Sequence, residues 1–265
     1  MKLIDSHSHL TYEGIIDNLD EIFRQCAAVG VSDCITVGTD SDENLKVVEL
    51  IEKYEHIYGS VGIHPHNAAT CRPDDIERLA EFAKHKKIVA IGETGLDFYY
   101  NFSHQAEQEQ LFIKSLQTAA DCKLPAIIHS RNAFERTVEI LNDFGVHLPK
   151  IVFHCFSGDA RQADILLEKG FYLSFTGVIT FKNAELLRQA AKIVPLDRML
   201  IETDCPYLSP EPMRKQKINT PALLIYTAKK IAEIKGIPLE EFAEEITKTT
   251  KKFFDIIDMP NKSAG

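Results

Sequence analysis

Short apolar runs recur along this 265-residue chain roughly every 20 to 35 residues, the length of one strand, one helix and two loops. The runs that indicate strands lie at about residues 3–5, 33–37, 58–63, 88–91, 126–129, 151–154, 172–175 and 199–202. Segments between them show helical periodicity, as in residues 19–28, 43–54, 76–84 and 105–121. Strict alternation of strands and helices implies parallel strands, and eight such units in about 250 residues match a (β/α)8 TIM-type barrel.

The main alternative fold is a doubly wound open sheet. That fold usually carries a glycine-rich phosphate turn after its first strand, whereas this chain continues from Leu3-Ile4 into Asp5-Ser6-His7-Ser8-His9. A last helix is predicted over residues 239–256, and the sequence shows no linker or low-complexity tract. The sequence therefore predicts a single α/β barrel domain over residues 1–265.

Composition limits the partners and the compartment. Thirty-nine acidic residues against 30 Lys plus Arg leave a net charge of -9, so a polyanionic substrate would have to be attracted by local cations or metal ions. The six cysteines form no CxxC pair, which favours reduced thiols and a reducing compartment. Because no signal segment or membrane-length apolar stretch is found, we expect a cytoplasmic protein without a membrane partner. A monomer is compatible with this sequence.

Most of the unusual polar residues follow the carboxyl ends of predicted strands. In chain order they are His7, His9, His64, His66, Glu93, His129, Arg131, His154 and Asp204. In a barrel these ends converge on one mouth, which is where active sites are found. Each residue also has a plainer interpretation, such as a helix cap for Glu93 or a hydrogen-bonded core histidine for His129 and His154.

The mixture of histidines and carboxylates is typical of a metal centre. Residues two apart on a strand face the same way, so His7 and His9 can bind one ion. Four histidines and two carboxylates are enough ligands for two divalent ions, which together can stabilise the attacking and leaving oxygens of a hydrolysis. Asp204 is then a candidate to orient water or take its proton. Asp5 and Glu202 share strand faces with these residues and are left outside the ligand set.

Five sequence blocks, in order along most of the chain, resemble the signature blocks of the TatD family of metal-dependent deoxyribonucleases, which are amidohydrolase-like barrels. The blocks are Asp5-Ser6-His7-Ser8-His9-Leu10, Gly62-Ile63-His64-Pro65-His66, Gly92-Glu93-Thr94-Gly95-Leu96-Asp97-Phe98-Tyr99, His154-Cys155-Phe156-Ser157-Gly158 and Glu202-Thr203-Asp204-Cys205-Pro206-Tyr207-Leu208. The resemblance implies a somewhat distorted barrel, two divalent ions, and hydrolysis of DNA phosphodiester bonds, often from the 3′ end.

The resemblance also implies a role for each residue. His7, His9 and Asp204 would bind the first ion, His129 and His154 the second, and Glu93 would bridge them. His64 would face the substrate and Arg131 its phosphate. The ions remain open among Zn, Mn, Mg, Co and Ni.

Other functions remain in view, because one barrel supports many reactions. The alternatives are an amidase, lactonase, deacylase or small phosphodiesterase on the same metal pair, and a metal-dependent binding protein without catalysis. The segment Arg214-Lys215-Gln216-Lys217-Ile218-Asn219-Thr220-Pro221 departs from the family's short basic loop, which makes the grip on nucleic acid less certain. Its cations border the predicted mouth, whereas Tyr99 and Tyr100 are interpreted as packing residues.

Overall fold

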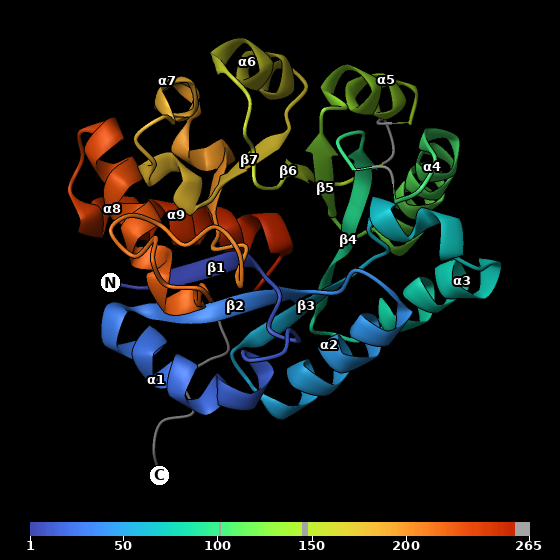
Figure 1. The fold of residues 1–265 in the computed structure, drawn as a ribbon, viewed down its shortest axis with the longest axis horizontal. Helices are drawn as coiled ribbons and strands as arrows, with labels where there is room; N and C mark the ends of the chain where they lie inside the picture. The colour runs from blue at the N-terminus through green and yellow to red at the C-terminus, as the bar shows by residue number, and fades with distance from the viewer. Residues whose placement is uncertain (101, 145–147, 258–265) are drawn as a thin grey trace.

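A computed structural model describes residues 1–100, 102–144 and 148–257, in which strands alternate with helices around a barrel (Figure 1). The strands are β1 (Leu3–Ser8), β2 (Val31–Val37), β3 (Ile57–Val61), β4 (Ile88–Asp97), β5 (Ala126–Arg131), β6 (Ile151–Phe153), β7 (Tyr172–Phe175) and β8 (Met199–Ile201). The helices are α1 (Leu19–Val29), α2 (Ser41–Lys53), α3 (Pro73–Phe82), α4 (Gln105–Cys122), α5 (Phe134–Phe144), α6 (Ala160–Glu168), α7 (Glu185–Ile193), α8 (Leu224–Lys235) and α9 (Leu239–Phe254). Short 3-10 helices are η1 (Ile16–Asn18), η2 (Pro65–Thr70), η3 (Gly177–Thr180), η4 (Leu196–Arg198) and η5 (Pro221–Leu223).

The predicted (β/α)8 barrel is confirmed. The strands form one parallel sheet in the order β1 to β8, and α1 to α8 surround them (Figure 1). The barrel closes through the segment that follows β8. There the Asp204 N–H donates to the His7 carbonyl at 3.0 Å, and the His9 N–H donates to the Cys205 carbonyl at 2.8 Å. Closure therefore brings the end of β1 against Asp204.

The interior of the barrel is apolar up to about the middle of most strands, and in β2 it is apolar as far as the last residue, Val37. Its buried side chains are Ile4, Ile35, Val37, Val89, Ala90, Ile127, Val152, Tyr172 and Leu200, and they pack with Phe253 and Phe254 at the end of α9. Helix α9 crosses the amino-terminal end of the barrel, because Thr247 donates to the Lys2 carbonyl at 2.8 Å and Lys150 donates to the Lys252 carbonyl at 2.6 Å. The polar site residues thus have only the carboxyl-terminal end available.

Three strands run further than their apolar runs predict, and one of them, β5, continues to Arg131. Strand β1 continues to Ser8 and β4 continues to Asp97, so Glu93 lies inside β4 and not at its end. Both strands carry register shifts, between Asp5 and Ser8 in β1 and between Ile91 and Thr94 in β4. The apolar pattern stops early because the second half of each strand carries polar side chains of the mouth. Within the described part of the chain, no helix has the length and apolar character needed to cross a membrane.

The seal formed by α9 is testable. Phe253 is fully buried among the interior side chains, whereas Ile257 just beyond α9 is 84% exposed. Because truncating a buried Phe removes its burial and leaves a cavity, we expect Phe253→Ala to lower the free energy of unfolding by about 3–5 kcal/mol in urea titrations. Ile257→Ala is the matched control and should change it by less than about 0.5 kcal/mol. Equal effects of the two substitutions would refute the packing role of α9.

Candidate metal centre

Six side chains from five strands meet at the carboxyl-terminal end of the barrel. His7 lies in β1 and His9 follows it, Glu93 lies in β4, His129 in β5, His154 follows β6, and Asp204 follows β8. These are the six metal ligands expected from the sequence. Four of them are buried, and His129 and Asp204 are half-buried.

One group of donor atoms comes from the ends of the first and the last strand of the barrel, at the place where the barrel closes. His7 Nε2 lies 3.3 Å from His9 Nε2, and Asp204 Oδ1 lies 3.4 Å from His9 Nε2 and 3.8 Å from His7 Nε2. Two ligands that each lie 2.0–2.1 Å from one tetrahedral ion are about 3.3 Å apart. The spacing of His7, His9 and Asp204 therefore fits a shared ion.

A second group lies across the barrel mouth. His129 Nδ1 and His154 Nε2 are 3.4 Å apart, and Glu93 Oε1 lies 2.7 Å from each of them. The other oxygen of this carboxylate, Oε2, lies 3.4 Å from His7 Nε2. Glu93 thus presents one oxygen to each group.

Three histidines are oriented by acceptors behind them. The contacts are His9 Nδ1 to the Val37 carbonyl at 3.2 Å, His129 Nε2 to Asp97 Oδ2 at 3.2 Å, and His154 Nδ1 to Glu202 Oε1 at 3.3 Å. Carbonyls and carboxylates only accept hydrogen bonds, so His9 carries a proton on Nδ1 and His129 carries one on Nε2, whereas Glu202 lies beside His154 Nδ1 without a hydrogen bond to it. The other nitrogen of each ring faces the carboxylates of the cluster, and once it is deprotonated its lone pair can bind a metal ion.

His64 differs from the six. The His66 backbone N–H donates to His64 Nδ1 at 3.1 Å, so the proton of the neutral ring sits on Nε2, which faces Glu93 Oε1 at 3.4 Å. Burial lowers the pKa of His64 to about 4, which keeps the ring neutral. Although His64, Glu93 and His129 lie close enough to hold an ion, the bond to Nδ1 makes His64 a donor toward the mouth. The role of His64 in facing the substrate stays a prediction.

The carboxylates of the cluster are ionised despite their burial. Burial alone would raise the pKa of Glu93, but the charge of His154 and hydrogen bonds from His129 and His154 hold it well below its usual value. Burial likewise opposes ionisation of Asp204, and its bond to His9 outweighs that effect and lowers its pKa. Both groups therefore have the charge that binds cations.

Glycines let β4 and β5 approach closely beside Glu93. Gly95 pairs with His129 in the ladder and has φ +140°, and a Cβ on it would lie 2.0 Å from the His129 carbonyl oxygen. The register shift next to Glu93 turns its side chain inward. The motif Gly-Glu-Thr-Gly is thus a backbone requirement as well as a source of a ligand.

Asp97 supports the cluster although no role was assigned to it from the sequence. Its Oδ2 contacts both His129 Nε2 and His66 Nε2, the latter at 2.9 Å. Its Oδ1 accepts the backbone N–H groups of Tyr99 and Tyr100, each at 2.9 Å. A signal was present, because Asp97 falls in the same block as Glu93, but its partners depend on the pairing of β4 with β5.

The two acids left outside the ligand set behave differently. Glu202 accepts from Ser174 Oγ at 2.5 Å and lies 3.3 Å from His154 Nδ1, so it shares the site as a support for His154. Asp5 does not share the face of His7, because its carboxylate accepts the N–H and Oγ1–H of Thr203 at 2.9 Å and 2.5 Å. Burial raises the pKa of Asp5 to about 8.

Arg131 lies exposed at the end of β5. Its guanidinium sits over the rings of Tyr99 at 4.3 Å and Tyr100 at 4.8 Å. These tyrosines are 55% and 39% exposed, so their interpretation as packing residues was wrong. In the segment after β8, Lys215 and Lys217 are exposed, and the Arg214 guanidinium lies 3.7 Å from the ring centre of Phe181.

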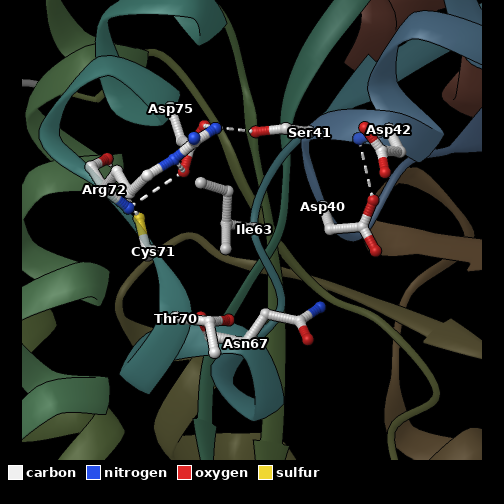
Figure 2. Close-up of a pocket in the computed structure, with 9 residues that line it drawn as sticks. All are labelled: Asp40, Ser41, Asp42, Ile63, Asn67, Thr70, Cys71, Arg72 and Asp75. Carbon is white, nitrogen blue, oxygen red and sulfur yellow. Dashed lines mark hydrogen bonds and ion pairs between the residues drawn. The ribbon is translucent and has the colours of Figure 1, made fainter.

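Two cavities lie near the mouth. Figure 2 shows one of about 230 Å³ between the start of α2 and the start of α3, where Arg72 is bonded to Asp75; the six clustered residues are not among its described lining residues. The other, of about 450 Å³, is lined by His154 together with polar side chains that include Ser130 and Asn132. The second cavity adjoins the cluster through His154.

Comparisons with known proteins agree with this geometry. A family model described as TatD related DNase matches residues 4–255. An uncharacterized metal-dependent hydrolase, YabD of Bacillus subtilis, is 39% identical over 254 residues, covering 96% of this chain and 99% of the relative. The protein named 3′-5′ ssDNA/RNA exonuclease TatD from Cronobacter sakazakii is 36% identical, covering 88% and 90%. The crystal structure of YJJV, a TatD homolog from Escherichia coli, superposes with a TM-score of 0.90 at 26% identity, covering 96% and 98%.

The contact between Asp97 and His129 yields a prediction. A carboxylate behind a metal-ligating histidine orients the ring and raises its basicity. We therefore expect Asp97→Asn to weaken metal binding by about 10- to 100-fold, measured by titration of the metal-free protein with Zn²⁺ or Mn²⁺ in a calorimeter. The matched control is Asp20→Asn, at an exposed acid of α1, which should bind metal as the wild type does. Wild-type affinity in Asp97→Asn would show that this contact is not needed.

Proposed function

The chain belongs to the family of TatD-related DNases and is a metal-dependent hydrolase, and from this we propose that it hydrolyses DNA phosphodiester bonds from the 3′ end with two divalent ions. The observation that carries the proposal is the Glu93 carboxylate, whose oxygens each face a separate group of imidazoles. The relative named as a 3′-5′ exonuclease for single-stranded DNA and RNA supports the choice of substrate.

We assign the ligands according to these two groups. His7, His9 and Asp204 would hold one ion, His129 and His154 would hold the other, and Glu93 would contribute to both. Four imidazoles suit Zn or Mn, while the carboxylates and a phosphate substrate leave room for Mg, Co or Ni. When bound, the ions would supply the positive charge that activates water and stabilises charge on the phosphoryl oxygens.

The remaining steps fall to the protein's own side chains. Asp204, an ionised carboxylate at the mouth, accepts the proton of the attacking water. The Nε2–H of His64 donates a hydrogen bond to a phosphoryl oxygen, because its Nδ1 is already engaged. Arg131 at the exposed end of β5 balances the charge of the phosphate. The leaving oxygen departs as an alcohol once it has taken up a proton.

We infer further that residues 1–265 form one domain with a single active site, acting as a cytoplasmic monomer on DNA ends without a membrane partner. The second candidate is an amidase, lactonase, deacylase or small phosphodiesterase at the same metal pair. The net charge of -9 favours this rival, because it provides no overall attraction for a polyanion. The discriminating measurement is hydrolysis of neutral esters and amides against hydrolysis of nucleic acids.

The proposal predicts metal-dependent shortening of DNA from one end. Metal-stripped protein should be inactive, and addition of Mn²⁺, Zn²⁺, Mg²⁺, Co²⁺ or Ni²⁺ should restore cleavage of single-stranded oligonucleotides followed on a gel. A 5′-labelled strand should give a ladder of shortened products, whereas a 3′-labelled strand should release its label in the first step. His129→Ala should lose this activity and keep its melting temperature within a few degrees, because it removes a ligand and not a core side chain.

The control is His85→Ala, since His85 precedes β4 at the opposite end of the barrel and should cleave as the wild type does. Cleavage by His129→Ala at the wild-type rate would refute the site. If the wild type spares nucleic acids with every ion yet hydrolyses a neutral ester or amide, the rival function is correct.

A further inference from the structure

We propose that Tyr99, Tyr100, Phe102 and Arg131 form a platform on which the unpaired bases of a nucleic-acid strand stack beside the metal centre. We call these four residues the aromatic rim. This inference rests on the proposed nuclease function and adds to it a site for the bases, which the cluster of imidazoles and carboxylates does not provide.

The rings of the aromatic rim are exposed together. Tyr99, Tyr100 and Phe102 are 55%, 39% and 65% exposed, although large aromatic side chains normally bury most of their surface. Tyr100 and Phe102 stack with ring centres 5.4 Å apart and planes at 20°. Tyr99 meets Tyr100 edge to face at 4.8 Å. The result is a contiguous aromatic surface that faces solvent.

The guanidinium of Arg131 adds a positive charge to this aromatic surface. The Arg131 guanidinium lies over both tyrosine rings, which is a favourable position for a cation on the face of an aromatic ring. Rings that offer their faces, together with positive charge that follows the backbone, are the elements with which proteins bind single strands. A basic group on an aromatic surface suits a nucleic acid better than it suits an apolar protein partner, so we commit to a strand of nucleic acid.

The aromatic rim is fixed to the metal centre by one carboxylate. Asp97 Oδ1 accepts the N–H groups of Tyr99 and Tyr100, while its Oδ2 lies 3.2 Å from His129 Nε2. Asp97 also pairs with Arg131 in the ladder between β4 and β5, two residues beyond the pair of Gly95 and His129. When a base stacks on the rim, the sugar–phosphate backbone of its strand therefore lies beside the candidate metal ligands.

The loop that carries the rim is also held from its other side. The ring of His66 contacts Phe102 with centres 4.8 Å apart, and Ser103 Oγ donates to the His66 carbonyl at 2.8 Å. The Ala69 N–H in turn donates to Ser103 Oγ at 3.0 Å. Because η2 anchors the rim in this way, binding a strand would cost little ordering of the protein.

Stacking on ring faces predicts a definite selectivity. Every base has a π-face, so the rim should accept all four bases, in DNA and in RNA. Bases paired within a duplex stack on each other and offer no free face at internal positions. The rim should therefore favour single strands and frayed ends over blunt duplexes, and it should contribute nothing to a strand that lacks bases.

The direct test uses a property of the composition, because the chain contains no tryptophan. Tyr99→Trp places a single fluorescent indole in the rim. Tyr54→Trp is the matched control, since Tyr54 follows α2 just before the start of β3 and packs on Phe23 at 5.3 Å. It therefore lies near the amino-terminal end of the barrel, opposite the mouth. Both proteins are titrated, without metal, with a 12-nucleotide single-stranded DNA and with an abasic strand of the same length.

We expect the DNA to quench the fluorescence of Tyr99→Trp and leave Tyr54→Trp unchanged, and the abasic strand to quench neither. Equal quenching by the two strands would show that the rim binds only the backbone and would overturn the proposal. Wild-type folding of both variants is checked by circular dichroism.

Kinetics provide the second test. Since stacking of one base contributes about a 5- to 150-fold change in affinity, Phe102→Leu should raise KM for single-stranded DNA by about that factor and leave kcat nearly unchanged. Tyr54→Leu should keep the wild-type KM. An unchanged KM in Phe102→Leu, with the wild type still cleaving DNA, refutes the rim alone. No cleavage of nucleic acid by the wild type refutes the proposed function instead. A shift of Phe102→Leu from dimer to monomer in sedimentation would show that the rim contacts a second copy and would overturn the proposal.

Discussion

A single buried carboxylate connects the two halves of this barrel's mouth. Glu93 lies in β4, yet its oxygens meet imidazoles from β1, β5 and the end of β6. An ionised carboxylate in such a place is tolerated only when charge and hydrogen bonds surround it. The rest of the site follows from that need: histidines converge on the carboxylate, and glycines allow β4 and β5 to approach. The function proposed for the chain depends on these imidazole and carboxylate atoms meeting in one place, where they can bind metal ions.

The strands divide into an apolar and a polar half along their length. Ile4, Val89 and Ile127 lie in the lower half, toward the amino-terminal ends of the strands, with the phenylalanines of α9. The site residues lie in the upper half, toward the carboxyl-terminal ends. Hydrophobic burial in the lower half stabilises the fold, and that stability offsets the cost of crowding acids and imidazoles above it. The same division explains why polar side chains gather only at the carboxyl-terminal end.

Much of this arrangement was predictable from the sequence, because burial of strands and helices leaves a periodic trace. The barrel was predicted from eight apolar runs, and the six clustered residues were found because they follow those runs. Asp97 was missed because its role depends on which residue of β5 it faces, and β4 shifts its register at Ile91. The same kind of shift in β1 separates Asp5 from His7 and defeats the rule of alternation. Tyr99 was misread because exposure depends on packing that single-residue tendencies do not encode.

The helix across the amino-terminal end of the barrel limits how a polymer can be handled. Phe253 and Phe254 close that end and apolar side chains fill the interior, so a strand cannot pass through the barrel. Whatever enters the mouth must leave by the same opening, so in the proposed nuclease reaction each released nucleotide would have to diffuse past the remaining polymer. An enzyme of this form cannot encircle its substrate. Repeated cuts on one strand would therefore depend on how long the surface around the mouth retains that strand between reactions. Processivity would be set by the rate at which the strand dissociates, because the protein does not enclose it.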